Sequence, residues 1–267
     1  MQFERTTAED GSIEFRLPGT NHNFAVPHID DGVLGTLPRT FFELALDATA
    51  GFVARNAAIV GDATLSTVGK EQKLDPERQK LVEQLAASAA SLDEEVAHAN
   101  RLEAKLTAVP MLDPTHSVMA AEDRERRDWW RSQSAQDRAA LLKQIDNDPA
   151  GNEPLMAALL RSPVPMLDHE KAFVRTIWNR TRRLANPTDA VVIDNARAAT
   201  DWARRGLLQV AAIGRNELGW DHARVLRTVL TCPNEKVQRG AGVFGFNGYN
   251  VAQMRQMLDF EAKRKAA

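Results

Sequence analysis

The sequence predicts a mainly α-helical protein with a long helix, a helical bundle and a short hairpin-like β arm at the N-terminus. The main observation is an uninterrupted helical pattern from Asp75 to Pro110. Its apolar residues recur at steps of three and four, which places them on one helix face. Several shorter amphipathic segments with capping residues follow. The first 35 residues instead show the two-residue alternation of a strand.

The N-terminal arm, residues 1–35, is predicted to hold a short hairpin. Residues 12–17 alternate between polar and apolar side chains, and Asp10-Gly11 is a turn signal before them. Proline and glycine then interrupt the segment as far as Gly32. Because two strands alone are only marginally stable, the arm must pack on something. It either covers the helices of its own chain or adds a strand to a neighbouring subunit.

Residues 36–110 are predicted to form a helical region. A first helix over 36–60 carries a broad apolar face, which is typical of a buried helix. A long helix over 76–109 follows, with Asp75 as its N-cap and Pro76 at its first position. A helix of this size is about 50 Å long, so we expect coiled-coil-like packing against helices of this chain or of a copy. The interaction face comprises Leu81, Leu85, Leu92, Val96, Leu102 and Leu106.

Residues 111–267 are predicted to form an α-helical bundle. Two helices meet near residues 132–134, where Ser134 and Asp137 resemble a capping box, and Trp129 and Trp130 anchor the first of them. Later helices are expected over 153–161, from a cap at Asp168, from Thr188 to Arg215, from a cap at Asp221, and after the glycine-rich stretch 240–249. The face of the 188–215 helix is built mostly of small residues, which permits close approach of another helix.

Composition restricts the location of the protein. No apolar run is long enough to span a membrane, and the first ten residues lack the pattern of a signal peptide. The single cysteine, Cys232, suits a reducing compartment. We therefore expect a cytoplasmic protein without membrane contact.

Charge is distributed unevenly along the chain although the formal net charge is only −2. Residues 1–160 contain 16 Lys+Arg and 26 Asp+Glu, whereas residues 161–267 contain 18 and 10. The favoured interpretation is that the two halves attract each other, within one chain or between copies. The alternative is that the basic half faces an acidic partner such as nucleic acid.

No motif predicts a cofactor, a metal or a catalytic residue. The GxGxxG pattern from Gly240 to Gly245 follows a polar, helix-like segment rather than a strand, so a loop between helices is favoured over a dinucleotide site. Residues 146–151 begin like a calcium loop, but Ala157 stands where a bidentate glutamate belongs. The six histidines form no metal-binding motif. An enzyme site built from residues distant in sequence remains an open alternative.

Nucleic acid is an alternative partner because two basic segments have few acidic neighbours. One helical stretch carries four arginines, and the chain ends in a basic triplet; phosphate contacts of this kind give affinity without sequence specificity. The candidate contacts are Arg175, Arg180, Arg182, Arg183, Lys263, Arg264 and Lys265.

Residues 122–185 combine a charged helix with Trp129-Trp130, an arginine-led apolar segment at 138–142 and the stretch LMAALLRSP at 155–163. This combination resembles uncharacterised helical proteins from the structural gene modules of tailed phages and prophages. The resemblance implies a role in assembling or completing a virus particle, and hence a virion location, but it carries over no functional residue.

These observations together favour a non-enzymatic structural or assembly protein. We expect it to associate with itself as a homo-oligomer or to dock on a larger protein assembly through its helix faces. The basic C-terminal half keeps a nucleic-acid-associated protein as the second hypothesis.

Overall fold

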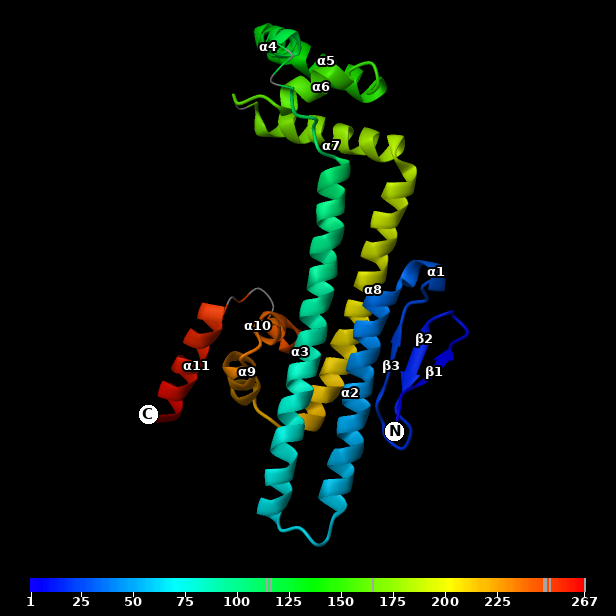
Figure 1. Ribbon diagram of the computed structural model, residues 1–267, viewed down its shortest axis with the longest axis vertical. Coiled ribbons are helices and arrows are strands. Elements are labelled where there is room, and N and C mark those ends of the chain that lie inside the picture. The colour runs from blue at the N-terminus through cyan, green and yellow to red at the C-terminus, as the bar shows by residue number, and fades with distance from the viewer. Residues whose placement is uncertain (114, 116, 165, 247–248, 250, 267) are drawn as a thin grey trace. The chain divides into compact units, whose positions relative to one another are not determined.

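The computed structural model describes residues 1–113, 115, 117–164, 166–246, 249 and 251–266, without the side chains of residues 31, 261, 262 and 264–266 (Figure 1). Over the described residues the protein has eleven α-helices and a small N-terminal sheet, and 74% of it is helical. The predicted fold class is confirmed. The chain divides into two compact units: unit 1 comprises residues 1–99 and 195–267, and unit 2 comprises residues 100–194.

The N-terminal arm of unit 1 is a three-stranded antiparallel sheet rather than a two-stranded hairpin. Strands β1 (Glu4–Thr7), β2 (Ile13–Arg16) and β3 (Asn23–Val26) are ordered β1-β2-β3. Ile13 and Phe15 on β2 are buried, as their alternation predicts. Phe15 meets the ring of Phe42 edge-on at a centroid distance of 5.3 Å. Phe42 lies on α2, so the sheet packs on a helix of its own chain.

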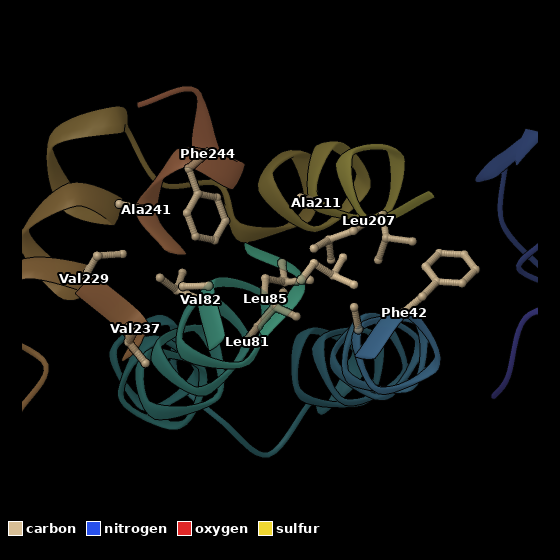
Figure 2. Close-up of a cluster of buried hydrophobic side chains, with 14 of the residues drawn as sticks. Phe42, Leu81, Val82, Leu85, Leu207, Ala211, Val229, Val237, Ala241 and Phe244 are labelled. Atoms are coloured by element: carbon tan, nitrogen blue, oxygen red, sulfur yellow. The ribbon is translucent and has the colours of Figure 1, made fainter. Parts of the chain in front are cut away.

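Three long helices pack side by side within unit 1 (Figure 1). After the short helix α1 (Asp31–Leu34), they are α2 (Thr36–Gly61), α3 (Thr67–Leu106) and α8 (Pro187–Leu218). Figure 2 shows Leu81 and Leu85 of α3 and Leu207 of α8 directed toward one another. All three side chains belong to the buried hydrophobic core of unit 1. The expected small-residue contact occurs at Gly206 of α8, where a Cβ atom would lie 2.6 Å from Cε2 of Phe42.

Helix α3 begins nine residues earlier than predicted, so the assignment of Asp75 as N-cap and Pro76 as first residue is wrong. Pro76 lies inside the helix, where its missing N–H leaves one carbonyl without a helical partner. Contacts on both sides of Pro76 hold the extra turns. Leu74 is buried, and Arg78 pairs with Glu71 at 2.6 Å across the proline.

The C-terminal part of unit 1 packs short helices against α3 and each other. These are α9 (His222–Thr231), α10 (Glu235–Arg239), the 3₁₀ helix η1 (Gly240–Phe244) and α11 (Val251–Ala266). Asp221 caps α9 as predicted, accepting a hydrogen bond from the backbone N–H of Arg224. The first half of the glycine-rich stretch, Gly240–Phe244, therefore forms part of a helical segment rather than a bare loop.

Ion pairs within unit 1 join the acidic and basic halves of the sequence. Helix α3 supplies the acids, and α8, α9 and α10 supply the bases. Glu94 pairs with Lys236 at 3.0 Å and with Arg239 at 2.9 Å. These partners lower the pKa of Glu94 below its ordinary value, chiefly through the hydrogen bond from Lys236. The other such pairs are Arg204 with Asp93 and Arg224 with Asp75.

Unit 2 has its own core, and four helices lie wholly within its described residues: α4 (Ser117–Ser132), α5 (Ala135–Asn147), α6 (Glu153–Leu160) and α7 (Asp168–Ala185). The break between α4 and α5 falls where it was predicted, and the Ser134 hydroxyl accepts a hydrogen bond from the N–H of Asp137. Asp168 is the first residue of α7 rather than its cap, because Leu167 takes the cap position. The buried core residues are Trp130, Ile145, Met156, Ala157, Leu159, Val174, Ile177 and Trp178.

Candidate functional site

The predicted interaction face of the long helix is divided between the two units. Leu81, Leu85 and Leu92 are buried in the core of unit 1, and Val96 is half-buried. These four residues therefore stabilise the fold of the chain itself. Leu102 and Leu106 belong to unit 2, where they are half-buried and line a surface groove.

This groove, called the α3–α8 groove below, has a volume of about 330 Å³. Helix α3 contributes one side and the first turns of α8 contribute the other, with the end of α7 between them. Its lining residues are Leu102, Lys105, Leu106, Arg182, Asn186, Asp189, Val192 and Ile193. Apolar side chains of both helices thus lie beside positive and negative charges.

The exposure of the groove residues distinguishes floor from rim. Ile193 is buried, whereas Val192 is 54% exposed. Helix periodicity turns Leu184 and Val191, which are 74% and 55% exposed, away from the groove. The groove therefore has a buried apolar floor and an exposed apolar side chain at its rim.

The two predicted tryptophan anchors differ in their environment. Trp130 is 3% exposed and belongs to the core of unit 2, whereas Trp129 is 46% exposed. Consecutive helical residues point about 100° apart, so only one of them can face the core. Trp130 also lines a second concave surface, about 370 Å³ in volume, called the arginine pocket below.

The arginine pocket is formed by α4, α5 and the segment from α6 to α7. Its lining residues are Arg127, Trp130, Arg131, Arg138, Leu159, Ser162, Val164, Met166, Leu167 and Glu170. Three guanidinium groups therefore face one carboxylate. Glu170 is 5% exposed and accepts a hydrogen bond from Arg138 Nε at 2.9 Å. Arg138 also donates to the Gln133 carbonyl at 2.8 Å, which fixes its position.

The other two arginines of the pocket are held less tightly. Arg131 donates to the exposed carboxylate of Asp128 at 2.8 Å and to the Ser162 hydroxyl at 3.2 Å. Among the described residues, Arg127 forms one ion pair, with Asp123 at 3.6 Å. The same carboxylate accepts two hydrogen bonds from Arg161, each 2.8 Å long. Asp123 is therefore already neutralised by Arg161, and the charge of Arg127 is only partly compensated.

Three of the four arginines proposed for nucleic-acid contact have acidic partners within unit 2. Arg180 pairs with Asp146 at 2.6 Å and Arg182 with Glu153 at 3.5 Å. Arg183 lies between Glu103 and Asp194, both at 2.5 Å, and the hydrogen bond to Asp194 is the main cause that raises its pKa.

The remaining candidates for nucleic-acid contact differ in their exposure. Arg175 is half-buried and Lys263 is exposed. The side chains of Arg264 and Lys265 lie outside the described residues. Most arginines of this stretch, which has few acidic neighbours in the sequence, therefore have acidic partners in the fold.

Within the described part of the chain, no group of three or more His, Cys, Asp or Glu side chains could hold a metal ion. No helix in that part is long and apolar enough to cross a membrane. Cys232 is buried and unpaired.

Comparison with known protein families, with curated proteins and with solved structures finds no match for this chain.

Sequence reasoning missed most of the residues that build the two concave surfaces. One sequence signal for the arginine pocket was available. The i, i+3, i+4 spacing of Arg127, Trp130 and Arg131 places their side chains on one helix face. Arg138 and Glu170 are 32 residues apart. Only the fold brings them together.

Proposed function

We propose that this protein is a non-enzymatic structural or assembly protein whose copies associate through the α3–α8 groove of unit 2. The observation that carries the proposal is the apolar lining of that groove, where Val192 is exposed beside the half-buried Leu102 and Leu106. Protein interfaces contain such apolar centres bordered by polar groups. The resemblance of residues 122–185 to uncharacterised helical proteins of phage and prophage structural gene modules supports a place in the assembly of a virus particle.

The charges of the groove favour a second copy as the occupant. Lys105 and Arg182 are positive, and Asp189 is negative. Most soluble homo-oligomers have two-fold symmetry, so the same patch meets itself and must be self-complementary. A groove with both signs of charge and apolar residues from two helices meets that requirement, whereas a groove of one sign would repel its copy.

The test is the solution mass of the protein and of two matched variants, measured by light scattering after size exclusion at low and moderate salt. Val192→Asp places a charge on the groove at a residue that is already 54% exposed. Val118→Asp makes the same change on α4, at a valine 67% exposed and outside the groove. Both variants should keep the helical circular dichroism of the parent.

We expect the parent protein to have twice the chain mass at both salt concentrations, because an apolar contact resists salt. Val192→Asp should weaken the dimer by about 2 kcal/mol or more, since burying an unpaired charge is costly, whereas Val118→Asp should leave it intact. A parent protein that is monomeric at about 100 µM, where a micromolar dimer would form, contradicts self-association. A Val192→Asp variant that remains dimeric contradicts the assignment of the groove.

A further inference from the structure

We infer that the arginine pocket of unit 2 binds the side-chain carboxylate of an acidic and otherwise apolar segment of a partner protein. This inference concerns a different surface from the α3–α8 groove and does not depend on self-association. Three features of the pocket support it: an excess of guanidinium groups, an apolar wall and a prearranged geometry.

The charge of the pocket selects an anion. Its lining contains three arginines and one glutamate. Glu170 is engaged by Arg138, so Arg127 and Arg131 remain to bind a ligand. The Arg127 side chain is only 16% exposed, and its ion pair with Asp123 spans 3.6 Å, which exceeds hydrogen-bond length for a charged pair. A guanidinium that is partly desolvated and loosely paired gains most from an added carboxylate.

The apolar part of the lining selects a peptide rather than a simple anion. Leu159 is buried, while Val164 and Leu167 are 50% and 52% exposed at the edge of the pocket. An inorganic phosphate would leave these side chains in water. The pocket offers no exposed Trp130 face on which a nucleic-acid base could stack, because Trp130 is only 3% exposed. A carboxylate flanked by apolar side chains contacts both the arginines and the apolar edge.

Buried neighbours hold the pocket in place before a ligand arrives. Arg138 is fixed by Glu170 and by the Gln133 carbonyl. Arg131 is braced by its hydrogen bond to the Ser162 hydroxyl. Because these side chains are already ordered, a ligand loses less free energy to ordering the site than it would at a surface of free lysines.

The experiment titrates the full chain with the probe N-acetyl-Leu-Asp-Leu-amide at constant ionic strength, following the peptide by saturation-transfer NMR. N-acetyl-Leu-Asn-Leu-amide tests the need for the charge, and inorganic phosphate tests for a simple anion site. Arg127→Gln removes the loosely paired guanidinium. Arg126→Gln is its matched control, because Arg126 also lies within 3.9 Å of Asp123 on the same helix but does not line the pocket.

We expect saturable binding of the aspartate peptide with a Kd of about 1 mM, typical of so small a contact. Arg127→Gln should weaken it at least about tenfold, as the loss of a charge-assisted hydrogen bond implies, and Arg126→Gln should leave it within about twofold. Should Arg127→Gln fail to fold, Arg131→Gln tests the second guanidinium at a side chain that is 42% exposed.

Four results would overturn the inference. They are no saturation up to about 10 mM, a concentration tenfold above the expected Kd; equal binding of the asparagine peptide; displacement by an equal concentration of phosphate; and equal weakening by both arginine variants. Val192→Asp should not change peptide affinity, so failure of this site and failure of the dimer can be told apart.

Discussion

At the scale of single residues, close backbone approach explains a glycine that the sequence motif left without a role. Gly240 opens the GxGxxG pattern, and η1 begins at this residue. A Cβ atom built on Gly240 would lie 1.8 Å from the carbonyl oxygen of Ala86 on α3. The glycine is therefore required because the backbone of η1 packs directly on the backbone of α3, which is a structural reason that needs no nucleotide.

Gly240→Ala is predicted to destabilise the protein by about 3 kcal/mol, because backbone atoms cannot move aside as a flexible side chain can. Urea unfolding followed by circular dichroism measures the change. Gly61→Ala is the control, since no atom lies within 4 Å of a Cβ placed there at the end of α2. Gly61→Ala should raise the free energy of unfolding by less than about 1 kcal/mol, because alanine has a higher helix propensity than glycine. Similar losses for both variants would contradict the close approach at Gly240.

At the scale of elements, helix periodicity was reliable and helix starts were less so. The start of α2 and the break between α4 and α5 agree with the sequence, because apolar spacing and a serine cap act within a few residues. The predicted start of α3 was wrong. Burial of Leu74 and the ion pair of Arg78 with Glu71 outweigh the helix-breaking tendency of Pro76. The third strand, Asn23–Val26, was missed because four residues are too short to show a clear alternation of apolar and polar side chains. Its backbone pairing with β2 holds it in the extended conformation instead.

The interior position of Pro76 gives an element-scale prediction. If α3 continues through Pro76, as the structure shows, Pro76→Ala restores an N–H donor to the helix and should raise the free energy of unfolding by about 1–3 kcal/mol. If the helix instead began at Pro76, the substitution would be neutral or slightly destabilising, because proline suits that position. Thermal and urea unfolding distinguish the two cases. Pro187→Ala, at the first residue of α8, is the matched control and should show no gain.

In the candidate site too, residue spacing predicted helix faces but not the contacts between helices. Leu102 and Leu106 could be chosen from the sequence because they continue the apolar spacing of α3. Their neighbours in the groove, Asp189 and Val192, come from α8 and could not be paired with α3 by spacing alone. The arginines of α7 looked uncompensated for a similar reason, since Glu103 lies 80 residues before Arg183 in the chain.

At the scale of the whole molecule, the charge asymmetry between the two halves of the sequence is removed by the fold. Unit 2 contains 14 Lys+Arg and 14 Asp+Glu, and unit 1 contains 20 and 22. Each unit combines segments from the acidic and the basic parts of the chain. Attraction between the halves, the favoured interpretation of the asymmetry, is therefore seen within one chain, in the pairs of Glu94 with Lys236 and Arg239.

The two units have separate hydrophobic cores although α3 and α8 contribute residues to both units. Whether they unfold separately can be tested at Asp123, which is 2% exposed and binds Arg161 through two hydrogen bonds. Asp123→Asn leaves the Arg161 charge, at a side chain only 19% exposed, without its carboxylate. Breaking such a pair costs about 3 kcal/mol. The loss of stability should be confined to unit 2, because Asp123 and Arg161 both belong to it.

Amide hydrogen exchange measures where that loss falls. Asp123→Asn should lower the protection of amides around Val174 and Trp178 in unit 2 and spare those around Leu85 and Leu207 in unit 1. Asp128→Asn is the control, since this carboxylate is 61% exposed and its pair with Arg131 contributes less than about 1 kcal/mol. Equal loss of protection in both cores would mean that the continuous helices α3 and α8 couple the units into one cooperative structure. A contact made by unit 2 would then stabilise the entire chain.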